Sequence, residues 1–246
     1  MAGLINLAWS LIINYMWFFA YTKTLVCFAN SRKYGGRCVA GKEWHRGATG
    51  QWVRPVSARP AQELMENDFR CADGAPARVL DILDISFKPG GKRAYQRENR
   101  LIKNGVAWKR AGALSWDDLA AWLDTPKSLW SLGQSSASGL NNRVAEGSTQ
   151  GESLYLIGVD YLHLLVGPKS VAPQDAKRVV RGEFLYRGAR YRLAVTDPVI
   201  EQYVLGRPDN VYFLPDPVLC VSLGEPFQGH YYKLIASVLT QKRCGS

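Results

Sequence analysis

The chain lacks the residue patterns that mark metal sites and disulfide frameworks. Its five cysteines (Cys27, Cys38, Cys71, Cys220 and Cys244) are an odd number with no C-x-x-C pair, and its three histidines lie far apart. Zinc sites need closely spaced ligands, and small secreted domains use dense, paired cysteines. We therefore expect reduced thiols in a cytoplasmic protein that holds neither a metal nor another cofactor.

A set of residues that would mark an enzyme is also missing. Asp117 and Asp118 stand at an expected helix start, where the helix dipole accounts for them. The segment Gly36–Lys42 has the G-x-x-x-x-G-K spacing of a P-loop, but Glu43 replaces the Ser or Thr that would bind magnesium. We expect no nucleotide hydrolysis and name no catalytic residue. An enzyme with an unrecognised site stays an alternative.

No charged side chain occurs in the first 22 residues. The apolar stretch 4–21 is just long enough to span a bilayer, but Asn6, Ser10 and Asn14 interrupt it, and a signal-peptide cleavage site is missing. Residues 1–21 are therefore interpreted as a leader, either a membrane anchor with a cytoplasmic body or an extension that begins upstream of the true start.

Positive charge exceeds negative charge, with 31 Lys and Arg against 21 Asp and Glu. The surplus is concentrated in three blocks, Lys23 to Arg59, Lys88 to Arg110 and Lys177 to Arg192, each of which contains a single acidic residue. A basic surplus favours a polyanionic partner, nucleic acid first and an anionic membrane second. The alternative is that each block is a solvated surface.

Short apolar segments separated by Gly, Pro and Asn predict a mainly β protein. "TLVCFANS", "QWVRPVS" and "ARVLDILDISF" indicate strands in the first half, and "GEFLYRGARYRLAVTD" indicates a hairpin with a turn at Gly188 in the second. "SWDDLAAWLD" predicts a short helix capped by Ser115. Two blocks of short strands predict two tandem OB-like β-barrels with a short helical insertion.

The Ser- and Gly-rich composition of residues 133–152 predicts a linker between the two halves. The expected organisation is a leader over 1–21, a first OB-like domain with a helical segment over 22–132, this linker, and a second OB-like domain over 153–246.

Arginines and aromatics alternate around glycines in "NSRKYGGRCVAGKEW" and in "QWVRPVS". Arginine binds phosphate and aromatic rings stack on bases, so this mixture is typical of nucleic-acid contacts. The candidate binding residues are Asn30, Ser31, Arg32, Lys33, Arg37, Trp52 and Arg54, with Asn141, Asn142, Arg143 and Lys233 as further candidates. Two alternatives stay open: the strand aromatics are core residues, and the two asparagines form a turn.

Several strings, in order, resemble the dual-OB domain proteins of prokaryotes. They are "LVCFANSRKYGGRCVAGKE", "WVRPVS", "VLDIL", "YQRENRLI", "LNNRV", "YRLAVTDP" and "CVSLGEPFQGHYYKLIASVL". The resemblance covers about Thr22 to Leu239 and leaves out the leader. It implies two OB-like barrels, gene neighbourhoods of conflict or defence systems, and binding of nucleic acids or nucleotides, with no catalytic residues to carry over.

We therefore expect a protein that binds nucleic acid, single-stranded or otherwise accessible at its bases. The alternative is a sensor that takes one nucleotide or modified base in a pocket. Affinity that grows with oligonucleotide length separates the first function from the second.

Overall fold

The computed structural model describes residues 20–45, 48–149, 151–168 and 177–245. The leader predicted over 1–21, including the anchor proposed for 4–21, falls almost entirely outside these residues. Among the helices that the structure describes, none has the length and apolar character needed to cross a bilayer.

The first half folds into a closed five-stranded barrel. Its strands are β1 (Tyr21–Lys33), β2 (Gly36–His45), β3 (Ala48–Val56), β4 (Asp81–Lys88) and β5 (Asn99–Ile102), with β6 (Lys109–Ala113) added beside β4. β5 runs parallel to β3, and β4 closes the barrel by pairing with β1. This is the five-stranded Greek-key barrel of an OB fold.

The second half repeats the same strand order with one strand broken in two. Its elements are β7 (Arg143–Ala145), β8 (Leu154–Gly158), β9 (Tyr161–Pro168), β10 (Arg178–Tyr186), β11 (Ala189–Val195), α2 (Pro198–Leu205), β12 (Val211–Pro215), β13 (Val218–Phe227), β14 (His230–Leu239) and α3 (Gln241–Cys244). β14 runs parallel to β11, β13 pairs with β14, and β12 pairs with β9. β12 and β13 are joined by Asp216 and Pro217, so together they take the place of the fourth OB strand. The predicted fold class, two tandem OB-like barrels, is confirmed.

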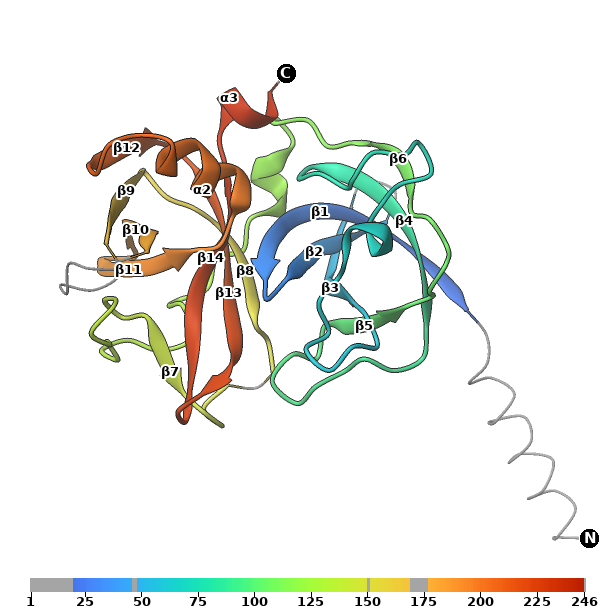
Figure 1. The fold of residues 1–246 in the computed structure, drawn as a ribbon, viewed down its shortest axis with the longest axis horizontal. Helices are drawn as coiled ribbons and strands as arrows, with labels where there is room; N and C mark the ends of the chain where they lie inside the picture. The colour runs from blue at the N-terminus through green and yellow to red at the C-terminus, as the bar shows by residue number, and fades with distance from the viewer. Residues whose placement is uncertain (1–19, 46–47, 150, 169–176, 246) are drawn as a thin grey trace, which may run out of the picture.

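Strand β1 is buried on both faces. Leu25 and Cys27 belong to the core of the first barrel, whereas Val26 and Phe28 belong to a second core that lies between the barrels. Successive side chains of a strand point to opposite faces, so full burial of 25–28 requires cover on both sides. In Figure 1 the cover on the second side comes from β8, β13 and β14.

The residues of this interbarrel core come from both halves of the chain. The first half contributes Val26, Phe28, Ala29, Ala40, Leu80, Ile82, Leu119 and Trp122, and the second contributes Leu154, Leu156, Val218, Cys220, Ala236 and Leu239. The outer face of β1 and β2 is therefore an interior surface of the molecule.

The helix expected over "SWDDLAAWLD" is reduced to one turn of 3-10 helix, Leu119–Trp122. Ser115 accepts the predicted capping bond from the Asp118 N–H at 3.1 Å. The chain then becomes extended at Leu123, and the Asp124 N–H donates to the Leu156 carbonyl of the second half at 2.6 Å. That bond and the burial of Trp122 in the interbarrel core end the helix early.

The segment 133–152, expected as a linker, is joined to the second barrel in its described part. Leu140 exchanges backbone hydrogen bonds with Arg192 of β11, and β7 pairs with β14. It thereby fills the space where β11 and β14 diverge. The hairpin predicted at Gly188 is confirmed, with Arg187 and Gly188 as its two turn residues at positive φ.

Candidate functional site

The turn between β1 and β2 projects from the first barrel beside the second. Its last strand pair is Lys33 and Gly36, and Tyr34 and Gly35 form the turn. Tyr34 has a φ of 48° and is 68% exposed, an unusual conformation for a bulky residue. A Cβ at Gly36 would lie 2.5 Å from the Leu64 carbonyl oxygen, so this position requires glycine where Glu63 and Leu64 approach β2.

Gly36 to Lys42 lie in β2, so the P-loop spacing corresponds to a strand and not to a phosphate-binding loop. A Cβ at Gly41 would collide with the Val26 carbonyl of β1. Lys42 is buried and donates to Asp124 Oδ1 at 2.7 Å. The two glycines and the lysine are thus explained by packing.

A pocket of about 860 Å³ lies between the barrels, next to the β1–β2 turn. The first barrel lines it with the turn and with the segment 64–79, and the second lines it with the start of α2 and with Arg243. Its volume is within the usual range for small-ligand sites.

Four arginines line this pocket: Arg32, Arg37, Arg78 and Arg243. Arg32 pairs with Glu201 of α2 at 2.8 Å, and Arg243 pairs with the buried Asp197 at 2.5 Å. The side chains of Arg37 and Arg78 make no ion pair within the part of the chain that the structure describes. The acidic residue of the lining, Glu66, pairs with Arg70, so Arg37 and Arg78 are the two lining arginines without an ion-pair partner among the described residues.

The rest of the pocket is mostly apolar. Leu64 and Phe69 form a buried part of its wall, and Met65 and Val199 are exposed at 41% and 54%. Asn30 also lines the pocket and donates from Nδ2 to the Ala77 carbonyl at 2.9 Å. Because a carbonyl only accepts, this bond fixes the orientation of the Asn30 amide.

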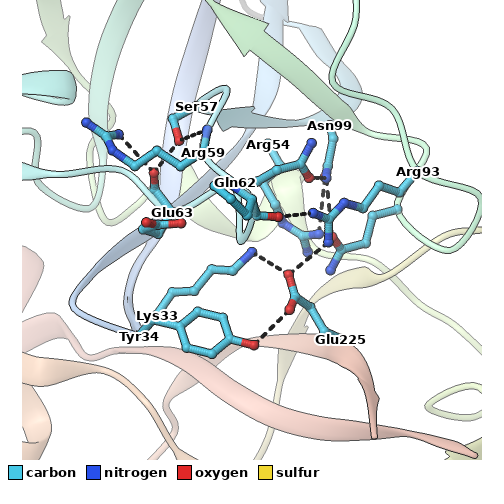
Figure 2. Close-up of polar contacts among 12 residues, drawn as sticks. Lys33, Tyr34, Arg54, Ser57, Arg59, Gln62, Glu63, Arg93, Asn99 and Glu225 are labelled. Carbon is cyan, nitrogen blue, oxygen red and sulfur yellow. Dashed lines mark hydrogen bonds and ion pairs between the residues drawn. The ribbon is translucent and has the colours of Figure 1, made fainter.

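On the other side of the turn, three donors of the first barrel meet a carboxylate of the second. Glu225 of β13 accepts from Lys33 Nζ at 3.1 Å, from Tyr34 Oη at 2.8 Å and from Arg93 Nη1 at 2.9 Å (Figure 2). Burial alone would raise the pKa of Glu225, but the bonds from Tyr34 and Lys33 and the charges of Lys33 and Arg93 outweigh it and lower the pKa.

Three of the predicted binding residues, Asn30, Arg32 and Arg37, line the pocket, and Lys33 lies beside it in the Glu225 cluster. Ser31 is buried and donates to the Cys38 carbonyl at 3.3 Å, across the β1–β2 pair. Its hydroxyl therefore stabilises the hairpin.

Arg54 is buried and Trp52 is half-buried against the interbarrel core, contrary to the expected contacts with ligand. Arg54 is 2% exposed and pairs with Glu98 at 3.0 Å and with Ser153 Oγ at 2.9 Å. Trp52 packs on the interbarrel core and donates from Nε1 to Asp124 Oδ2 at 3.1 Å. Both residues point from the outer face of β3 toward the second half of the chain, so the interbarrel contact covers them.

The candidates of the second half do not reach the pocket. Asn141 accepts from the Gly133 N–H at 2.6 Å, and Asn142 accepts from the Ser136 N–H at 2.9 Å, as the alternative of an Asn-rich turn requires. Arg143 begins β7. Lys233 is 1% exposed and donates to the Ser131 carbonyl at 2.6 Å inside the second barrel.

Sequence reasoning missed Arg78, Arg243 and the role of Tyr34. Arg78 lies within the acidic segment 63–84 and Arg243 stands near the end of the chain, so neither belongs to one of the basic blocks. The positive φ of Tyr34 left no signal, since Tyr is an unusual residue for that conformation.

These features define a protein of two OB-fold barrels joined by a common core, with a basic pocket at their junction. The chain belongs to the family described as the dual OB-containing domain, whose model matches residues 23–238. Searches of curated proteins and of solved structures returned no match.

The burial of Arg54 generates a stability prediction. Arg54→Met leaves the Glu98 carboxylate, which is 7% exposed, without its cation, and we expect a loss of about 3–5 kcal/mol in the free energy of unfolding. Adding Glu98→Leu should recover most of that loss, because no buried charge then remains. Urea denaturation measures both. Unchanged stability with weakened oligonucleotide binding would instead make Arg54 a ligand contact.

Lys233 generates a pH prediction. Burial lowers its pKa to about 8, whereas the unfolded chain has a lysine pKa of about 10.4. Below pH 8 both states hold the proton and the buried ammonium destabilises the fold; between these pKa values the unfolded state binds more protons, so stability rises with pH. The free energy of unfolding of the wild type, relative to Lys233→Met, should therefore increase from about pH 8 to 10. A flat difference would contradict the burial of this ammonium.

Proposed function

We propose that the protein binds nucleic acid at the interbarrel pocket, through nucleotides that are not base-paired. The observation that carries the proposal is the pair of uncompensated arginines, Arg37 and Arg78, in a pocket beside the exposed ring of Tyr34. Arginine neutralises phosphate, and an exposed aromatic ring stacks on a base whose faces are free. The apolar wall around Leu64 and Phe69 suits a base, and the arginines suit its phosphates.

The usual binding surface of an OB fold supports the same location. OB barrels bind oligonucleotides on the face of their second and third strands and on the loops beside it. In the first barrel that face holds Trp52 and Arg54 and is covered by the second half of the chain. The β1–β2 turn, one of those loops, stays exposed and lines the pocket.

A sensor for one nucleotide or modified base is the second candidate function, since the pocket has the volume of a small-ligand site. Labelled oligothymidines of about 4, 8 and 16 nucleotides distinguish the two, because OB folds cover about 4–16 nucleotides. Affinity that rises with length favours the nucleic acid, and affinity that is the same for a mononucleotide favours the sensor.

The proposal is for binding and not for catalysis, and it assigns no cofactor. From the family resemblance we further propose a role in a prokaryotic defence system. We place the body of the protein in the cytoplasm, where its five cysteines, all free in the structure, stay reduced.

Neutralising the two free arginines tests the site. We expect Arg37→Gln with Arg78→Gln to weaken single-strand binding and to flatten the slope of log affinity against log salt by about 1.4, since each phosphate contact contributes about 0.7. The matched control is Arg187→Gln with Arg190→Gln, which removes the same charge from two exposed arginines of the β10–β11 hairpin. Fluorescence anisotropy measures both. If the two double variants have equal slopes, the change in affinity follows from net charge alone, and the proposed binding site is contradicted.

Tyr34 separates stacking from stability. Asn adopts a φ of 48° more readily than Tyr, and this gain offsets the loss of the exposed Tyr34–Glu225 hydrogen bond, so Tyr34→Asn should leave the melting temperature nearly unchanged. The same change removes the ring and should cost about 1–3 kcal/mol of binding free energy. Tyr34→Phe retains the ring and should bind more tightly than Tyr34→Asn. If Tyr34→Asn binds as well as the wild type, the ring is not a stacking platform.

A further inference from the structure

Glu225 lies in a site built for an anion. Its three donors, Lys33, Tyr34 and Arg93, belong to the first barrel. In these three contacts the second barrel contributes the Glu225 carboxylate alone. Figure 2 shows Lys33 and Tyr34 pointing toward this carboxylate from one side and Arg93 from another. Two cations and a hydroxyl around one acceptor are also the donors that bind a phosphate oxygen.

Arg93 is also held by contacts that do not involve Glu225. Arg93 donates to the Pro60 carbonyl at 2.7 Å and to Tyr95 Oη at 2.7 Å, both within the first barrel. The Lys33 side chain is only 14% exposed, at the end of the β1–β2 pair. Arg93 therefore keeps two partners when Glu225 moves away, and Lys33 stays at the end of the β1–β2 pair.

The carboxylate, in contrast, stands where the second barrel is irregular. The β13–β14 register shifts between Leu223 and Pro226, so Glu225 lies in a bulge, and the next residues, Pro226 to Gln228, are exposed at the end of the hairpin. A bulged residue is not fixed by ladder hydrogen bonds, so a small movement there breaks few of them.

We propose that Lys33, Tyr34 and Arg93 bind one backbone phosphate of the nucleic acid, and that Glu225 occupies this phosphate site when no strand is bound. The inference rests on the proposed function. Tyr34 connects the pocket with the Glu225 site, because Tyr34 lines the pocket and its hydroxyl donates to Glu225. A strand whose base enters the pocket continues past Tyr34 and places its next phosphate against Lys33 and Arg93.

Displacement of Glu225 makes binding at the second site depend on prior binding in the pocket. A mononucleotide fills the pocket and leaves Glu225 in place. A longer strand adds a second phosphate, held near the site by the first contact, that competes with the carboxylate. Glu225 therefore lowers affinity for every ligand that reaches the second site.

The test compares Glu225→Gln with Glu183→Gln in the full chain, with fluorescein-labelled oligothymidine of about 12 nucleotides as the probe. Glu183 is the matched control: it pairs with Arg192 at 2.7 Å, so its change also frees an arginine, on β11 and away from the pocket. We expect Glu225→Gln to bind more tightly than the wild type and its salt slope to steepen by up to about 0.7, the share of one phosphate. Between about 50 and 200 mM salt the gain should shrink by up to about 2.6-fold. Glu183→Gln should change neither quantity.

Adding Lys33→Gln to Glu225→Gln should remove most of the gain. If Glu225→Gln is too unstable to assay, Lys33→Gln in the otherwise unchanged chain should flatten the wild-type slope by less than about 0.7. The wild type displaces Glu225 in only a fraction of its complexes, and that fraction then loses the contact of the phosphate with Lys33.

Three results would overturn the inference. The first is unaltered or weaker binding by a folded Glu225→Gln, and the second is an equal gain in affinity in Glu183→Gln. The third is an unchanged salt slope in Lys33→Gln. The proposed function would survive each of these results, since it depends on Arg37 and Arg78. A wild-type protein that binds no oligothymidine at low salt would instead remove the proposed function, and this inference with it.

Discussion

The packing of Val26 and Phe28 against the second barrel is the contact on which the rest of the molecule depends. It places β1 between two cores, so the outer face of the first barrel becomes interior. Arg54 and Trp52, on β3 beyond β2, are covered by the same contact and find partners in Glu98 and Asp124. The surface on which an OB barrel usually binds its ligand thus holds the two barrels together.

The charges at the junction follow a division between the halves. Arg32, Lys33 and Arg93 come from the first barrel, and the carboxylates that they meet, Glu201 and Glu225, come from the second. These ion pairs are partly exposed, so each contributes little to stability, and the apolar core supplies most of the free energy of the contact. The pairs instead determine which cations around the junction carry free charge.

The sequence allowed the strands and the β10–β11 hairpin to be predicted, because alternation and turn residues are local signals. What covers a strand face is not local. "QWVRPVS" shows which side chains share a face of β3, but the covering residues, such as Asp124 and Ser153, lie far along the chain. For that reason the prediction that Arg54 contacts a ligand does not agree with its buried position. Asn30, Arg32 and Arg37, which were predicted on the same grounds, do line the pocket. Helix α2 was missed although Asp197 and Pro198 are a common helix start, with Asp197 capping two N–H groups.

The shared core also sets where the molecule can be cut. A recombinant fragment that ended in the segment 133–152 would expose Val26 and Phe28 to water, and its counterpart would expose Leu156 and Val218. Each fragment would then carry an apolar patch of the kind that drives aggregation. Gene fission at this point would require two products that find one another again, so we regard the pair of barrels as the unit that recombination can move between larger proteins.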